Sequence, residues 1–222
     1  MQLYPIKHHS WVAIDIHHNL GEQATLLTNK AASTHKTGSM YCRHLLKKLQ
    51  QALNVTGELM DTNFPYHFIT ADGYTWYVSF SHSRQHAAVL ISPYTNIGID
   101  VEDSAISHQV ASRFFSPHEY QWLNQKPAVN QAVLRNLLWR LKECAIKTHQ
   151  NADKQLIKEL KHDVLDELGE EVINHLIGAD EINAKDKSKN KPKNKPIQCV
   201  QTDAKIIGNF NSQPCSFIIV NR

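Results

Sequence analysis

The chain has 222 residues, of which 41% are hydrophobic and 20% are charged, enough for one large domain or two small ones with a hydrophobic core. Its 24 basic residues nearly balance 21 acidic ones, and a formal net charge of +3 does not favour a nucleic-acid binder. The four cysteines are far apart and form no CxxC pair, which argues against a zinc knuckle and against a disulfide-rich secreted scaffold. No stretch of the sequence is long and apolar enough to predict a membrane span.

The first half of the chain predicts a strand, a helix and three further strands. Residues 9–18, HSWVAIDIHH, alternate weakly between polar and apolar side chains, as a strand does. Residues 34–53 carry apolar side chains at helical spacing and basic ones between them, so they predict a helix with a basic outer face. The short runs YHFIT, WYVSFSH and HAAVLIS are separated by turn residues and predict antiparallel strands.

The second half begins after a break at Pro93 and Tyr94. Helical patterns fill residues 104–124 and 132–149, and a long polar stretch follows. Two strands close the chain, in IQCVQTDAKIIGNF and PCSFIIVN. Helix followed by antiparallel strands in each half predicts an α+β fold of two similar subdomains, a pseudo-dimer in which each helix packs on a small antiparallel sheet. We place these subdomains at residues 1–94 and 95–222.

One segment of the second half has low complexity. Residues 183–196, NAKDKSKNKPKNKP, are rich in lysine and contain no aromatic side chain. This composition predicts a disordered surface loop. The alternative is an arm for nucleic acid or an acidic partner, and the lack of aromatic residues for base stacking weakens the nucleic-acid version.

An acidic alternation at NIGIDVED marks the first candidate site. Asp100 and Glu102 lie two residues apart in a predicted strand, so both point to one face, about 6 to 7 Å apart along the strand. Two carboxylates on one face suit Mg²⁺, which takes few protein ligands and completes its shell with water and phosphate oxygens. The alternative is an ordinary strand end with one wet face.

A second candidate lies on the predicted helix LLWRLKECAIKTH. Its leucines share one face, while Trp139, Glu143 and Lys147 share the opposite face, with Lys142 on the flank between them. An exposed ion pair from Glu143 to Lys147 is the simplest interpretation of that face. The tryptophan, however, indicates that something covers it.

A third candidate is the strand end SFSHSRQ. Ser81 and His82 are neighbours and therefore point to opposite faces of a strand, which argues against a serine hydrolase. Hydroxyl, imidazole and turn amides together favour phosphate binding. The chain has no GxxxxGK[ST], GxGxxG, HExxH or GxSxG motif that would supply another phosphate-binding or catalytic site.

Taken together, SHS, IGIDVE, RFFSPHEY and WRLKECAIK occur in the order that resembles the 4′-phosphopantetheinyl transferase superfamily, and within it the surfactin-synthetase-activating type. Residues 35–37, His-Lys-Thr, are similar to the family's His-Arg-Thr at the start of a helix. Two departures are Cys144, where the family often has alanine or serine, and Gly73-Tyr74-Thr75, where many members have Gly-Lys-Pro. The longer family members are monomeric pseudo-dimers, which fits the fold predicted above.

The resemblance implies an enzyme that moves the phosphopantetheine arm of coenzyme A to a serine of an apo carrier protein and releases 3′,5′-ADP. It implies that Asp100, Glu102 and Glu143 bind Mg²⁺, or Mn²⁺ in its place. Glu143 is also the candidate base for the serine proton. Lys142 and Lys147 are expected to contact the pyrophosphate, with Lys147 stabilising the leaving group.

The resemblance also implies a binding site for the rest of coenzyme A. Ser81 and His82 are expected to hold the 3′-phosphate with the help of Lys36, and Thr37 is expected near the adenine. Asp100 is expected to face the coenzyme as well as the metal. Phe114, Phe115 and the apolar surface near them are expected to help receive the carrier protein.

For partners we expect an apo acyl, peptidyl or aryl carrier protein of fatty-acid, polyketide or siderophore synthesis, together with coenzyme A, and neither nucleic acid nor a membrane. We expect a monomer in the cytoplasm. One alternative is another Mg²⁺-dependent phosphoryl-transfer enzyme or phosphodiesterase that uses the same acidic face. Another is a non-catalytic module that binds an acidic partner through the lysine-rich arm between Lys185 and Lys195.

Overall fold

The computed structural model describes residues 1–16, 34–149, 163–177 and 196–221, and of residues 34–37 it describes only the backbone. The lysine-rich segment predicted at 183–196 lies outside the described residues except for Pro196.

The first half forms an antiparallel sheet, sheet A, with the strand order β1-β2-β5-β4-β3. Its strands are β1 (Gln2–Pro5), β2 (Trp11–Ile16), β3 (His67–Ile69), β4 (Thr75–His82) and β5 (His86–Ser92). The helix predicted at 34–53 is α2 (Thr34–Ala52). The predicted strands are thus confirmed, and β1 is an additional edge strand of four residues.

The second half forms another antiparallel sheet, sheet B, with the strand order β6-β9-β8-β7. Its strands are β6 (Ile97–Val101), β7 (Ile197–Gln201), β8 (Lys205–Phe210) and β9 (Cys215–Val220). Between β6 and β7 the chain contains the helices α3 (His108–Phe114), α4 (Pro117–Asn124), α5 (Ala128–His149), α7 (Val164–Leu168) and α8 (Glu170–Leu176).

The two sheets repeat one topology. In sheet A, β2 leads to α2, and the last strand of the following meander, β5, pairs antiparallel with β2. In sheet B, β6 leads to the helices, and the last strand of its meander, β9, pairs antiparallel with β6. The predicted α+β fold with two similar units is therefore confirmed, with helices and two antiparallel sheets.

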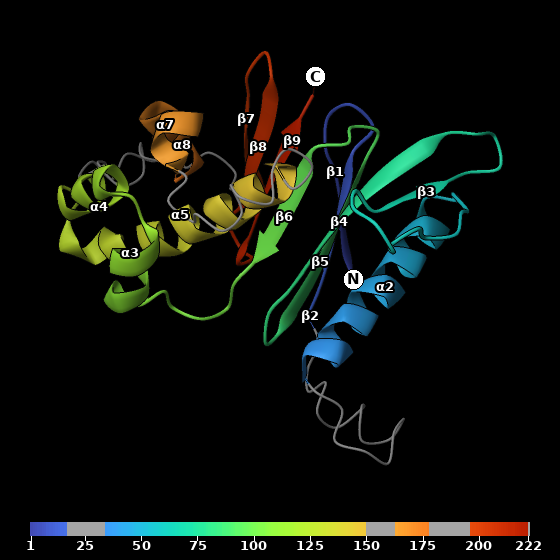
Figure 1. Ribbon diagram of the computed structural model, residues 1–222, viewed down its shortest axis with the longest axis horizontal. Coiled ribbons are helices and arrows are strands. Elements are labelled where there is room, and N and C mark those ends of the chain that lie inside the picture. Colours follow the sequence, from blue (N-terminus) through green and yellow to red (C-terminus); the bar gives the residue numbers. More distant parts are fainter. Residues whose placement is uncertain (17–33, 150–162, 178–195, 222) are drawn as a thin grey trace, which may run out of the picture.

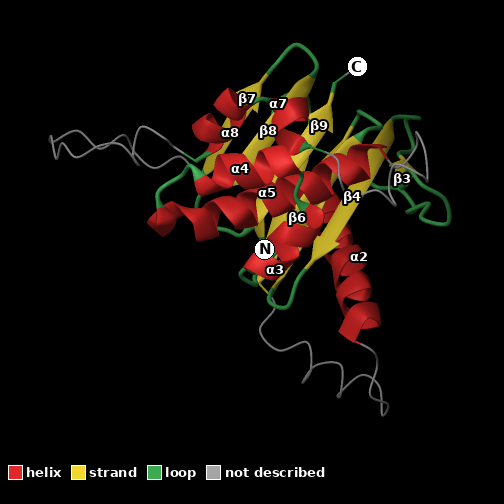
Figure 2. Cartoon of the chain, turned by 60° about the vertical axis from the view of Figure 1, so that its left-hand side comes forward, coloured by secondary structure: helices red, strands yellow, loops and turns green. Residues whose placement is uncertain are grey.

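The elements are stacked in four layers, with the two sheets face to face in the middle (Figure 1). Apolar side chains from both sheets fill the space between them, among them Ile14 and Leu90 of sheet A and Ile99 and Phe217 of sheet B. Helix α2 covers the outer face of sheet A, and α5 lies across the outer face of sheet B (Figures 1 and 2). The leucine face predicted for α5 is buried in that outer core.

The helical pattern predicted at 104–124 is divided into two helices by Phe115 and Ser116. Ser116 has an extended backbone and begins α4, because its hydroxyl accepts a hydrogen bond from the amide of Glu119. The Glu119 carboxylate in turn accepts from the Ser116 amide, and Pro117 occupies the first turn. This capping box explains why a continuous apolar pattern does not give one continuous helix. In the part of the chain that the structure describes, no helix is long and apolar enough to cross a membrane.

Candidate active site

The open edge of β6 meets β4 through serine hydroxyls. Ser79 Oγ accepts a hydrogen bond from the amide of Ile99 at 3.2 Å, and Ser81 Oγ accepts one from the amide of Val101 at 3.1 Å. Alternate residues of a strand share a face, so the serines of SFSHS reach alternate amides of β6. These contacts satisfy donors that an edge strand would otherwise leave unpaired. They place β6, which carries the acidic residues, directly beside β4.

Asp100 is the most buried of the predicted metal ligands, with 7% of its surface exposed. Its Oδ1 accepts from Ser81 Oγ at 2.9 Å and from Lys147 Nζ at 3.1 Å. Lys147 Nζ also donates to the carbonyl of Ile99 at 2.6 Å. The Lys147 side chain therefore extends from α5 to β6. Its ion pair is with Asp100 and not with Glu143 of the same helix.

Gly98 explains how β6 approaches helix α5 so closely. A Cβ atom on Gly98 would lie 2.1 Å from the carbonyl oxygen of Cys144, well inside any real contact distance. A residue with a side chain would push the strand away from the helix. The glycine of IGIDVE thus brings Asp100 and Glu102 next to the KECAIK turns of α5.

Glu143 is half-buried on this side of α5. Burial raises its pKa above the ordinary value, and the negative charge of Asp100 raises it further, with Glu102 adding to the effect. Burial alone would lower the pKa of Lys147, but the carboxylate of Asp100 raises that pKa above its ordinary value. The three predicted carboxylates and Lys147 therefore share one electrostatic environment.

The donor set fits a hard divalent cation in its chemistry, because all three candidate ligands are carboxylates. Their oxygens are not gathered tightly: among the described residues, Asp100, Glu102 and Glu143 do not form a group of ligand atoms within 4.8 Å of one another. Glu102 instead accepts a hydrogen bond from the amide of Ser104 at 2.8 Å. The three carboxylates would have to come closer together to bind one ion.

Lys142 does not lie where the resemblance implies. Its side chain is fully buried, and its Nζ lies 2.9 Å from Oε2 of Glu119, which is also fully buried. The same carboxylate accepts hydrogen bonds from the amides of Ser116 and Val164. Lys142 thus joins α5 to α4 and α7, and this placement argues against a direct contact with the pyrophosphate of a bound substrate.

His82 lies against helix α2. A Cβ atom on Gly38 would lie 2.5 Å from Nδ1 of the His82 ring. Gly38 directly follows Lys36 and Thr37 in α2, whose side chains lie outside the described residues. The end of β4 therefore packs on α2 two residues beyond Lys36. Sequence reasoning missed Gly38, although a glycine inside a helix is unfavourable and indicates close packing.

A further carboxylate, Asp103, lies just beyond the end of β6. Its Oδ2 accepts from the amide of Gln85 at 2.6 Å and from the hydroxyl of Ser83, and its Oδ1 contacts Nδ1 of His86. Ser83 and Gln85 lie in the turn between β4 and β5, and His86 is the first residue of β5. Burial alone would raise the pKa of Asp103, but the hydrogen bonds from Ser83 and Gln85 hold it below its ordinary value.

Another aromatic side chain covers Trp139, as its position on the polar face of the helix indicated. The Trp139 ring packs edge-to-face on Phe114 of α3, with ring centroids 5.7 Å apart. Phe115, in contrast, is buried in the core beneath α5. Of the two phenylalanines expected to contact the carrier protein, Phe114 is half-exposed and can do so, whereas Phe115 is buried and cannot.

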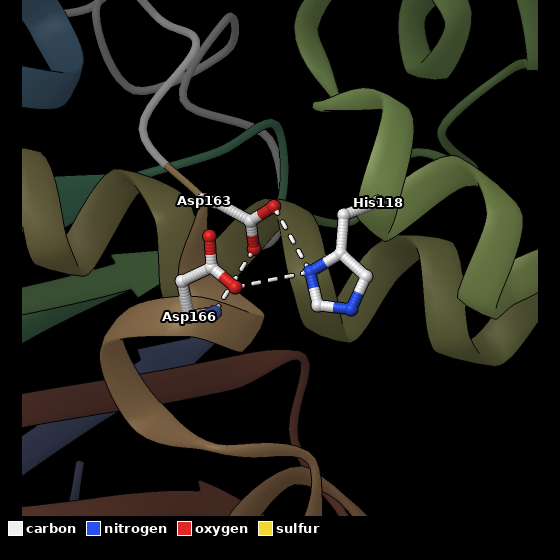
Figure 3. Close-up of side chains that lie close together, drawn as sticks. All are labelled: His118, Asp163 and Asp166. Carbon is white, nitrogen blue, oxygen red and sulfur yellow. Dashed lines mark hydrogen bonds and ion pairs between the residues drawn. The ribbon is translucent and has the colours of Figure 1, made fainter.

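His118, Asp163 and Asp166 form a separate cluster on α4 and α7 (Figure 3). The Nδ1 atom of His118 lies 3.3 Å from Asp163 and 3.1 Å from Asp166. Asp163 begins α7 by accepting from the amides of Leu165 and Asp166, and it also accepts from the hydroxyl of Ser116. Capping and ion pairing account for this cluster, which links the helices of the outer layer.

Residues 96–192 match the family profile described as the 4′-phosphopantetheinyl transferase superfamily. The matched segment covers a little under half of the 222 residues and includes the acidic strand and helix α5. Ser81, His82, Lys36 and Thr37 lie outside it. No curated protein sequence matches the chain. The match supports a phosphopantetheinyl transferase activity in general.

Proposed function

We propose that this protein transfers the phosphopantetheine arm of coenzyme A to a serine of an apo carrier protein, in the manner of the surfactin-synthetase-activating type. The observation that carries the proposal is the meeting of β4, β6 and α5, where Asp100 accepts hydrogen bonds from Ser81 and Lys147 beside the half-buried Glu143. The family match across β6 and α5 supports it. We further propose that the protein acts as a monomer in the cytoplasm.

In the proposed reaction, the serine oxygen attacks the phosphorus atom of the pyrophosphate that carries the pantetheine arm. A new phosphorus–oxygen bond forms to serine, and the bond to the bridging oxygen breaks, so 3′,5′-ADP leaves. Glu143 accepts the serine proton, and burial, which raises its pKa, also makes it a stronger proton acceptor. Lys147 lies next to Asp100 and supplies positive charge for the leaving phosphate.

A divalent cation held by Asp100, Glu102 and Glu143 would neutralise negative charge on the pyrophosphate oxygens. The chain's own contribution is to hold Asp100 in place through Ser81 and Lys147. Since the hydroxyl of Ser81 is engaged by β6, we assign the 3′-phosphate to His82 and the start of α2. Ser81 then acts through Asp100.

Incubation of the protein with coenzyme A, Mg²⁺ and an apo carrier protein tests the proposal. A mass increase of the carrier equal to one phosphopantetheine arm, with release of 3′,5′-ADP, is the expected result. A panel of acyl, peptidyl and aryl carriers identifies the substrate class. Breakdown of coenzyme A without carrier modification would instead support the phosphodiesterase alternative.

Deletion of residues 183–196 separates the enzyme from the binding-module alternative. The lysine-rich arm is distinct in sequence from the acidic strand and α5, so we expect transfer to continue without it. If the deletion abolished partner binding while the full chain showed no transfer, the non-catalytic module would be supported.

A further inference from the structure

We infer that Asp103 is a positioning residue: it holds the turn of residues 83–86 beside the acidic strand and thereby places His82 for the 3′-phosphate of coenzyme A. This inference rests on the function proposed above. Asp103 belongs to none of the motifs on which the family resemblance depends.

The register between β4 and β6 brings Asp103 to the β4–β5 turn. Ser79, Ser81 and Ser83 form the serine seam, in which each hydroxyl meets the residue 20 positions later in the chain. The hydroxyls of the first two serines accept hydrogen bonds from backbone amides of β6. The third lies past the end of both strands, and there the carboxylate of Asp103 replaces a backbone group. Asp103 is therefore the last contact of the seam.

Asp103 has three partners around the β4–β5 turn. Ser83, Gln85 and His86 occupy both sides of the tight β4–β5 turn, and each contacts one oxygen of the same carboxylate. Asp103 is 12% exposed and His86 is 11% exposed, so water competes little with these contacts. One carboxylate with three partners fixes the turn against β6.

The position of His82 depends on this turn. His82 is the last residue of β4 and pairs with Ala87, which follows His86 at the start of β5. Its ring lies against Gly38 of α2. A turn that came away from β6 would change the position of the strand end, and with it the position of the ring. Asp103 also lies one residue beyond Glu102, so the same contacts couple the 3′-phosphate region to the acidic strand.

The test compares how strongly the full-length protein binds 3′,5′-ADP and 5′-AMP, which differ only in the 3′-phosphate, by isothermal titration calorimetry. We expect the wild-type protein to prefer 3′,5′-ADP by about tenfold or more, which corresponds to about 1.4 kcal/mol or more. Asp103→Ala should reduce that preference by about tenfold, because loss of the fixed turn weakens only the contact to the 3′-phosphate. Asp103→Asn keeps the size of the side chain but only one acceptor oxygen, so it should reduce the preference by about threefold.

Asp163→Ala is the matched control. Asp163 is also 12% exposed and likewise accepts from a serine hydroxyl, backbone amides and a histidine, but it does so between α4 and α7. Its removal should lower the melting temperature and leave the preference for 3′,5′-ADP at the wild-type value. Thermal melts of all variants identify the temperature at which each is folded, and the titrations are made below it.

Equal binding of the two nucleotides by the wild-type protein overturns the inference, because no 3′-phosphate contact then exists to be positioned. An unchanged preference in Asp103→Asn, whether or not the alanine variant folds, also overturns it. If Asp163→Ala lost as much of the preference for 3′,5′-ADP as Asp103→Ala, the loss would reflect lower overall stability and the inference would be overturned. Binding is measured without a carrier protein. A failure of transfer would therefore contradict the proposed function and leave the inference about Asp103 standing.

Discussion

The ammonium nitrogen of Lys147 lies 3.1 Å from Oδ1 of Asp100 and 2.6 Å from the carbonyl oxygen of Ile99. One side chain of α5 thus holds both the backbone and the carboxylate of the acidic strand. The same carboxylate oxygen accepts from Ser81, which comes from the other sheet. The Asp100 carboxylate is therefore fixed by groups from two other elements, β4 and α5, and the reaction we propose depends on that arrangement.

Lys147→Ala should lower kcat for carrier modification by about 10²- to 10³-fold, the loss typical of one electrostatic donor aimed at developing charge. The control is Lys205→Ala. Lys205 is 20% exposed beside a Glu167 side chain that is 10% exposed, and Lys147 is 19% exposed beside an Asp100 side chain that is 10% exposed. Both substitutions remove a half-buried ion pair, and Lys147→Ala also removes the hydrogen bond to the Ile99 carbonyl, but only Lys147→Ala should impair transfer. A loss of less than about tenfold would make Lys147 a structural residue.

Glu143→Gln should abolish transfer and stabilise the fold at neutral pH. The pKa of Glu143 is higher in the folded chain than its ordinary value of 4.5, so the folded chain binds more protons between the two values. The free energy of unfolding therefore falls as the pH rises through that window. The glutamine variant lacks this loss, so it should be more stable than the wild-type protein at pH 7 and equal to it below about pH 4.5.

Urea denaturation across the pH range, in the presence of a chelator, measures this difference between wild type and Glu143→Gln. Retention of near-wild-type rates by the variant would refute both the base and the metal assignment. If the wild-type protein were instead more stable than Glu143→Gln at pH 7, with the advantage vanishing toward acid pH, the Glu143 pKa would be lowered rather than raised.

Addition of Mg²⁺ should raise the melting temperature of the wild-type protein, since a cation that binds only the folded state stabilises it by mass action. The carboxylates of Asp100, Glu102 and Glu143 repel one another in its absence. Glu102→Gln should shift the half-maximal Mg²⁺ concentration upward, whereas Asp166→Asn, in the separate cluster of Figure 3, should not. An equal Mg²⁺ response in Glu102→Gln and the wild-type protein would exclude Glu102 as a ligand.

Gly38→Ala should raise KM for coenzyme A without unfolding the protein. Alanine is favoured over glycine by about 1 kcal/mol in a helix interior, so α2 itself should not lose stability. The new methyl group would, however, lie 2.5 Å from the His82 ring and displace it. We expect KM to rise by about tenfold, in line with the loss of one hydrogen bond to a charged group. Met40→Ala, at an exposed position two residues later, is the control and should leave KM unchanged.

Local patterns in the sequence predicted much of this architecture. The spacing of the leucines predicted the buried face of α5. The shared face expected for Asp100 and Glu102 stays a prediction, because Glu102 lies one residue beyond the end of β6. The strands and the α+β class follow from the same periodicities. The family resemblance then indicated that β4, β6 and α5 share a site.

Contacts between distant elements could not be predicted in this way. The hydroxyl of Ser81 is taken up by β6, and a pattern within SFSHS says nothing about which edge strand lies opposite. Glycine is required at positions 38 and 98 because the His82 ring and the Cys144 backbone lie against them, and the sequence does not show these neighbours. Lys142 lies on the flank of α5, so its exposure depended on whether another helix covered that flank.

Lys142→Met should lower the free energy of unfolding by about 3–5 kcal/mol, because it leaves the buried carboxylate of Glu119 without its cation. A second change, Glu119→Gln, should recover part of that loss by removing the uncompensated charge, although one of the two amides at Ser116 and Val164 then loses its acceptor. Urea denaturation measures both effects. At a temperature where Lys142→Met is folded, KM for coenzyme A should stay near the wild-type value, because the lysine side chain is fully buried beside Glu119 of α4. A large rise in KM at unchanged stability would instead restore the pyrophosphate contact that the resemblance implied, and would require the lysine to leave Glu119 when substrate binds.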